Sequence, residues 1–355
     1  MKIKLAVLDK EQSYLERIST SLGHKYNDKL EIYCFTDMQK AVENVIKNNI
    51  DVFFASFSYE IDTSVLPERC GFAYLVDTKD VDLYNGERAV CKFQKLENIH
   101  NCIIDIYTDK NDIKLSTPIM SSDMPVYVFT SAVGGCGTSV AASAFSISLA
   151  KEGKKVIYLN LEKFGNTSFY FDGEGQYDLR DILIAIKSGK SNISMKLESM
   201  VKKDKTNVSF ISSPQKSLDI ATLTAADIKS LIELFKTSGA FDCVVIDIDF
   251  EVSDKITSLF NLSHAVILVS DASEKATYKI QRAYEAVSMS VNPENAAFLD
   301  RIVIFYNRVK NSLQSSINIP NVRTIGASPE YNNANVNDII RKMVEVNAFK
   351  DLLTL

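Results

Sequence analysis

Short apolar runs alternate with amphipathic helical stretches along most of the chain. Near its start, the runs "IKLAVLD", "LEIYCF" and "IDVFFASF" are separated by the helical stretches "EQSYLERISTSL" and "DMQKAVENVIKN". Strands that alternate with helices usually pair in parallel, because each helix returns the chain to the edge at which the next strand starts. The sequence therefore predicts an α/β protein made of doubly wound parallel sheets.

One segment interrupts this alternation. The stretch "TDKNDIKLSTPIMSSDMP" has no apolar period and contains two prolines, which is typical of a linker. The 355 residues of the chain suffice for two separate cores. We expect a first domain at residues 1–108, a linker at residues 109–124 and a second α/β domain at residues 125–355.

Charge and cysteine usage narrow the classes of partner and compartment. The net charge of −5 comes from interleaved lysines and acidic residues, without the basic stripe that binds a nucleic-acid backbone. None of the six cysteines forms a C-x-x-C pair, as is typical of free thiols in a reducing compartment. The sequence shows neither a signal peptide nor an apolar stretch of about 20 residues. We therefore expect a cytoplasmic protein without a nucleic-acid partner.

A glycine-rich turn, "SAVGGCGTS" at residues 131–139, joins an apolar strand to a helix rich in small residues. In the general phosphate loop G-x-x-x-x-G-K-[ST], amides wrap the phosphates, the lysine neutralises them and the hydroxyl binds magnesium. Gly137 matches the last glycine and Ser139 supplies the hydroxyl, but Thr138 replaces the lysine. On these residues alone, a phosphate loop and an ordinary tight turn both stay open.

Further motifs follow this loop in the order "NLEKFGN", "FDCVVIDID", "IVIFYNRV" and "IGASPE". Together with "VGGCGTS" they resemble the MinD/ParA-like family of deviant phosphate-loop ATPases over residues 125–355. Val133 stands where that family has its signature lysine, and Asn160 and Glu162 replace the two aspartates of its first switch. Asp247 matches the acidic position near magnesium.

The resemblance implies that the second domain binds ATP or ADP together with Mg²⁺. The residues it implies in nucleotide binding are Gly134, Gly135, Cys136, Gly137, Thr138, Ser139, Val140, Asn307, Arg308 and Pro329. In this scheme Asn307 and Arg308 meet the adenine and Pro329 covers it. Ser139 and Asp247 hold Mg²⁺, and Glu162 and Asp247 are the candidate catalytic residues.

Departures from the family pattern weaken the expected chemistry. Hydrogen bonds to charged groups contribute about 1.5–3 kcal/mol each, so losing both lysines weakens nucleotide binding by roughly two to four decades. The second switch reads "DIDFE" and lacks the glycine whose amide approaches the γ-phosphate. The loop amides and the helix dipole still favour phosphate. We therefore expect nucleotide binding with little or no hydrolysis.

The first domain resembles a response-regulator receiver, which has a flavodoxin-like fold. Its first strand ends at Asp9, but Lys10 follows instead of a second acid, and Ser56 stands at the phosphoacceptor position. Lys95 corresponds to the late lysine of receivers. These departures favour an interaction domain that is not phosphorylated. A receiver-like domain ahead of a MinD/ParA-like domain resembles the TadZ/CpaE pilus-assembly family.

This resemblance implies a homodimeric localisation or scaffold protein of a bacterial Tad-type pilus or secretion machine. Its partners would be proteins of that machine, which would recruit it to a cell pole or to an inner-membrane assembly. Two alternatives stay open. One is an active partitioning-type ATPase that recruits a cation such as Lys163, Lys275 or Arg308, and the other is a nucleotide-free pseudo-response-regulator that binds only proteins.

Two apolar segments also bear on partners. The cluster Phe164, Phe169, Tyr170 and Phe171 follows the first switch and is compatible either with a dimer interface or with core. The final stretch "NDIIRKMVEVNAFKDLLTL" has a helical apolar stripe but few basic residues to meet anionic lipid. We expect that helix to close the core of the second domain.

Treatment of the protein with acetyl phosphate and magnesium should leave residues 1–108 unmodified, because Ser56 replaces the aspartate that would attack the phosphoryl group. The expected mass of the intact protein is therefore unchanged. A stoichiometric phosphoryl adduct on these residues, detected by mass spectrometry, would contradict the interpretation.

Overall fold

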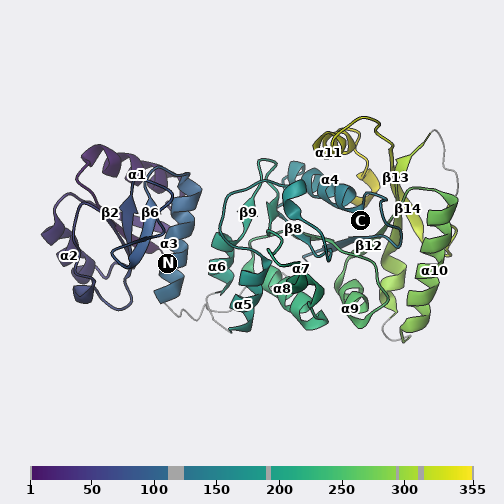
Figure 1. Ribbon diagram of the computed structural model, residues 1–355, viewed down its shortest axis with the longest axis horizontal. Coiled ribbons are helices and arrows are strands. Elements are labelled where there is room, and N and C mark those ends of the chain that lie inside the picture. Colours follow the sequence, from purple (N-terminus) through teal and green to yellow (C-terminus); the bar gives the residue numbers. More distant parts are fainter. Residues whose placement is uncertain (1, 111–123, 189–192, 293–295, 311–315, 354–355) are drawn as a thin grey trace. The chain divides into compact units, whose positions relative to one another are not determined.

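The computed structural model describes residues 2–110, 124–188, 193–292, 296–310 and 316–353 (Figure 1). These residues form two compact units. The first contains residues 2–110 and 193–199, and the second contains the remainder. None of the helices in the described ranges has both the length and the hydropathy of a membrane-spanning segment.

The first unit is a six-stranded sheet in the order β2-β1-β3-β4-β6-β5. All pairs are parallel except the last, in which β5 runs antiparallel to β6. The strands are β1 (Ile3–Leu8), β2 (Leu30–Phe35), β3 (Val52–Ser56), β4 (Gly71–Val76), β5 (Leu83–Tyr84) and β6 (Glu87–Cys91).

Helices cover both faces of this sheet. They are α1 (Gln12–Lys25), α2 (Met38–Lys47) and α3 (Leu96–Lys110). The apolar residues of α1 and α3 pack on one face and those of α2 on the other. Strands β3 and β4 are consequently buried along their whole length, which is why they read as continuous apolar runs.

Helix α6 (Ile193–Met200) is part of the first unit through Ser199, although the chain before and after it belongs to the second unit. The Ser199 hydroxyl donates a hydrogen bond of 2.5 Å to the carboxylate of Asp105 in α3, and both side chains are buried. The Lys196 ammonium pairs with Asp109 at 2.7 Å. Met195 packs against the apolar cluster of α1 and α3.

The second unit is an eight-stranded sheet in the order β14-β13-β12-β7-β11-β8-β10-β9. Its pairs are parallel except at β9, which runs antiparallel to β10. The strands are β7 (Val126–Thr130), β8 (Val156–Asn160), β9 (Lys202–Lys203), β10 (Ser209–Phe210), β11 (Cys243–Asp247), β12 (Ala265–Ser270), β13 (Ile302–Val309) and β14 (Arg323–Pro329).

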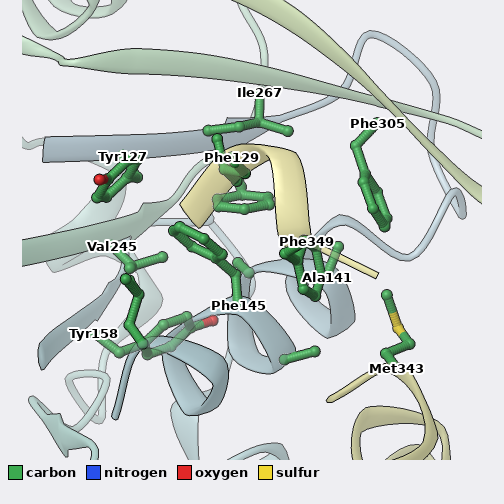
Figure 2. Close-up of a cluster of buried hydrophobic side chains, with 14 of the residues drawn as sticks. Tyr127, Phe129, Ala141, Phe145, Tyr158, Val245, Ile267, Phe305, Met343 and Phe349 are labelled. Atoms are coloured by element: carbon green, nitrogen blue, oxygen red, sulfur yellow. The ribbon is translucent and has the colours of Figure 1, made fainter. Parts of the chain in front are cut away.

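Helices again lie on both sides of the sheet (Figure 1). Those of the second unit are α4 (Thr138–Lys151), α5 (Leu179–Lys187), α7 (Ser217–Ala221), α8 (Ala225–Ser238), α9 (Asp254–Leu262), α10 (Glu274–Ser290), α11 (Val336–Glu345) and α12 (Lys350–Leu353). Helices α4, α11 and α12 pack over one face, where Phe349 stacks on Phe305 and also contacts Phe145 (Figure 2). The C-terminal stretch therefore closes this core, as predicted, but it does so as two helices and not as one.

The fold class expected from the sequence is confirmed: both units are α/β, with strands and helices in alternation. Most of the linker expected at residues 109–124 lies outside the described residues, so the proposed domain limits stay a prediction. Two details differ from the expectation. Helix α3 continues to Lys110, and α6 adds a segment to the first unit that local sequence gave no reason to place there.

Replacing Ser199 by alanine should accelerate hydrogen exchange of the α3 amides about ten-fold or more. A hydrogen bond to a charged acceptor contributes about 1.5–3 kcal/mol, and each 1.4 kcal/mol is a factor of ten in an opening equilibrium. Exchange mass spectrometry of the full chain measures this effect. Ser194→Ala, on the same helix, is the matched control, and equal exchange in the two variants would refute the role given to Ser199.

Candidate functional site

The glycine-rich segment forms the turn between β7 and α4, at the carboxyl end of a central strand. Gly135 and Gly137 adopt left-handed backbone conformations, with φ of 83° and 77°. Gly137 is the N-cap of α4 and has no side chain to accept hydrogen bonds from the first amides of the helix. The turn therefore presents backbone N–H groups and the positive end of a helix dipole, which suit an anion.

Two residues at the end of β13 hold this loop through its carbonyl oxygens. The Asn307 amide donates to the carbonyl of Cys136 at 2.8 Å and to that of Gly137 at 3.3 Å. The Arg308 guanidinium donates to the carbonyl of Gly135 at 2.7 Å. A Cβ atom on Gly137 would lie 2.5 Å from the Asn307 amide nitrogen, so only glycine fits there.

A polar cluster lies beside the start of α4. The Ser139 hydroxyl donates to the carboxylate of Glu162 at 3.0 Å. The Asn160 amide nitrogen lies 3.2 Å from Glu162 and 3.0 Å from Asp247 and donates to both carboxylates. The Tyr158 hydroxyl donates to Asp247 at 3.0 Å. The structure thus brings together Ser139, Glu162 and Asp247, which the sequence placed on three separate segments.

Asp247 is completely buried, and this determines its electrostatics. Burial, and then the nearby charge of Glu162, raise the pKa of the Asp247 carboxyl well above its ordinary value. Its Oδ2 accepts the bonds from Tyr158 and Asn160, whereas its Oδ1 has no hydrogen-bond partner among the described residues. A cation near Oδ1 would offset both the cost of burying the ionised carboxylate and its repulsion from Glu162.

The residues present fit a magnesium ion of the kind that completes its shell with phosphate and water. Mg²⁺ in proteins is held by one or two carboxylates together with substrate oxygens. Ser139 and Asp247 supply such oxygens, and Glu162 lies next to them. Within the described ranges no group of three or more His, Cys, Asp or Glu side chains forms a self-sufficient metal cage.

The loops that follow β8 and β11 are tied to each other. The Lys163 amide donates to Asp249 at 2.8 Å, and the Lys163 ammonium lies 2.9 Å from Glu251. Hydrogen bonding to Lys163 lowers the pKa of the Glu251 carboxyl to about 2. Lys163 therefore links these two loops. To substitute for the missing loop lysines, its ammonium would have to leave Glu251.

The aromatic segment after the first switch divides into exposed and buried parts. Phe164 and Phe169 are 89% and 65% exposed, whereas Phe171 is buried against Tyr158 and Phe210. Tyr170 is half-buried and packs against the same core. The cluster is thus core at its C-terminal end and free surface at its N-terminal end.

Pro329 is the last residue of β14 and pairs with Val309 across a register shift. It is exposed at the carboxyl edge of the sheet. Its contact with adenine stays a prediction, as does that of Asn307. Val140 lies in the first turn of α4 and packs against the core.

The corresponding edge of the first unit contains a buried ion pair. The Lys92 ammonium lies 2.6 Å from the carboxylate of Asp9 and 3.4 Å from the hydroxyl of Ser56, and the Lys92 side chain is 8% exposed. The late lysine is therefore Lys92, and its placement at Lys95 was wrong. The reason is that β6 ends at Cys91, so the next residue emerges at the carboxyl edge, whereas Lys95 directly precedes α3.

Sequence reasoning also missed Tyr158. It lies two residues before Asn160 in β8, so both side chains point to the same face of the sheet, toward Asp247. The same-face spacing of two polar side chains in an otherwise apolar strand was the available signal.

Comparison with known proteins follows the division into units. Residues 1–108 match the family described as TadZ-like, receiver domain. No curated protein sequence matches the chain significantly. Among solved structures, the MinC:MinD cell division complex of Aquifex aeolicus is similar at 17% identity and a TM-score of 0.50, covering 65% of this chain and 96% of that one.

Two further structures are similar over the same share of the chain. A ParA family ATPase from Chlorobium tepidum has 18% identity, a TM-score of 0.49 and 93% coverage of its own chain. The septum site-determining protein MinD of Pyrococcus horikoshii, complexed with Mg-ADP, has 18% identity, a TM-score of 0.48 and 94% coverage. Residues 1–108 therefore match the TadZ-like receiver-domain family, and the second unit has a fold similar to that of MinD.

Proposed function

We propose that the second unit binds ATP or ADP with Mg²⁺ and hydrolyses ATP weakly or not at all. The observation that carries the proposal is the uncapped start of α4, beside a buried carboxylate whose Oδ1 has no hydrogen-bond partner in the described structure. Phosphates would lie against the amides of residues 134–139, and adenine between Asn307 and Pro329. A phosphate would accept hydrogen bonds from the uncapped amides of α4, and a magnesium ion beside it would bind the carboxylate of Asp247.

In this proposal Ser139 and Asp247 hold Mg²⁺, which when bound would neutralise phosphate charge. Ser139 Oγ would turn from Glu162 toward the ion, and Glu162 would accept a hydrogen bond from Asn160 as it does now. Tyr158 and Asn160 would keep Asp247 in position by donating to its Oδ2. The protein's own contribution is thus an oriented carboxylate and a row of amides.

Slow turnover follows from what the loop lacks. Val133, at the signature-lysine position, packs against the core, and Thr138 begins α4 in place of the second lysine. Neither side chain supplies the positive charge that stabilises a transferring phosphoryl group. Binding without fast hydrolysis makes the nucleotide a structural element or a slow switch.

We further propose a homodimer that acts as a localisation or scaffold protein for a Tad-type pilus or secretion machine. The TadZ-like family of the first unit supports the connection to such a machine. The exposed Phe164 and Phe169 beside the site support an apolar contact with a second copy, because aromatic side chains anchor interfaces. The protein would work in the cytoplasm and reach a cell pole or an inner-membrane assembly through its protein partners.

Replacing Gly137 by alanine should abolish ATP binding measured by calorimetry. The new Cβ would meet the Asn307 amide at 2.5 Å and would strain a left-handed backbone, so the loop must shift. The thermal midpoint of the variant should fall as well. Gly134→Ala is the matched control for stability, since a Cβ there meets nothing within 4 Å, and its midpoint should stay unchanged. Wild-type affinity in Gly137→Ala would contradict the placement of the phosphates.

Replacing Phe164 and Phe169 together by serine should shift the protein from dimer to monomer in light scattering with saturating MgATP. The two exposed rings would contribute apolar contact area that serine cannot supply. Phe93→Ser is the matched control, because Phe93 is 61% exposed in the first unit. A wild-type protein that stays monomeric with saturating ATP would refute the dimer.

A further inference from the structure

We propose that Arg308 supplies the positive charge at the phosphate loop in place of the missing lysines. This inference rests on the proposed nucleotide site and gives Arg308 a different role from the adenine contact that resemblance suggests. It deepens that proposal by assigning the residue that distinguishes nucleotides by their number of phosphates.

The position of the guanidinium is the first observation. Nη1 donates to the carbonyl of Gly135 at 2.7 Å, and Nε would lie 3.6 Å from a Cβ built on Gly137. The group therefore lies along the loop between these two glycines. A guanidinium has five N–H donors in a planar fork, and the bond to Gly135 uses one of them. The fork suits phosphate oxygens bound to the same loop.

The backbone of Arg308 is the second observation. Its φ is 57°, in the left-handed region that non-glycine residues seldom adopt. The pairing of β13 with β14 also shifts register between Tyr306 and Val309, which marks a bulge around Arg308. Bulges redirect side chains, and residues held in sparsely populated conformations cluster at ligand sites. The irregularity directs Arg308 out of the strand pattern and onto the loop.

The charge of the surroundings is the third observation. Asp247 and Glu162 lie on one side of the site, and the charge of Asp271 acts on Cys136 within the loop. A bound polyphosphate would add further negative charge to this environment. Lys163, another cationic candidate, pairs with Glu251 at 2.9 Å. Arg308 is exposed and already touches the loop, so it can meet the phosphates without rearrangement of the backbone.

The test is calorimetric titration of the full chain with the magnesium complexes of ATP, ADP and AMP. The informative variant is Arg308→Asn, because asparagine tolerates a left-handed backbone and so removes the charge without added strain. Its ATP affinity should fall about 10- to 100-fold, its ADP affinity less and its AMP affinity least. Arg308→Lys should recover part of the ATP affinity.

Arg323→Asn, at the opposite end of the neighbouring strand β14, is the control for a lost surface charge and should bind all three nucleotides as wild type does. Equal losses for ATP, ADP and AMP in Arg308→Asn, or no loss, would overturn the role of Arg308 and leave the proposed function intact. A wild-type protein that binds none of the three nucleotides would overturn the proposed function itself.

Discussion

Parallel pairing of β11 with β7 on one side and β8 on the other is the constraint on which the site depends. In this register Asp247 lies opposite Phe129 and Asn160, so β8 and β11 end at the same level and β7 ends one residue later. The glycine turn continues β7, and Glu162 follows β8 by two residues. A slip by one residue would turn Asp247 toward the other face and dismantle the cluster. Apolar residues along the three strands, buried on both faces, hold that register.

Asn160 stabilises the two acidic side chains of the cluster. The MinD/ParA-like family, which residues 125–355 resemble, has an aspartate at this position. An ionised aspartate can only accept hydrogen bonds. The amide of Asn160 instead donates to Glu162 and to Asp247, so one neutral group bridges two acidic side chains. A third carboxylate there would add repulsion to a site that already raises the pKa of Asp247. Asparagine in place of the first aspartate therefore suits a site that already holds two acidic side chains. One of these two is Glu162, which replaces the second aspartate of the family pattern.

The sequence was informative where the structure depends on periodicity and on strand ends. Alternating apolar runs and amphipathic helices predicted both α/β folds, and in the structure the residues at the ends of β8 and β11 lie near Ser139 at the start of α4. Three features were not predicted from the sequence. Helix α6 meets Asp105, 94 residues away in the chain, through Ser199. Lys92 rather than Lys95 reaches Asp9, because the position at which β6 ends decides it. The short turn at Thr167–Phe169 separates an exposed Phe164 from a buried Phe171, and the spacing of the aromatic residues does not reveal that division.

The chain returns to the first unit at α6, after part of the second unit has been synthesised. This affects the order in which the units can fold during synthesis. Domains commonly fold as units from the N-terminus as the ribosome adds roughly 5–20 residues per second. Strands β1 to β6 can pair once residue 110 has emerged, but the helix that covers part of α3 follows about 90 residues later. For several seconds the nascent first unit therefore exposes apolar surface that Met195 later covers. By the end of that interval β7, α4, β8 and α5 of the second unit have also left the ribosome, so the synthesis of the two units is interleaved.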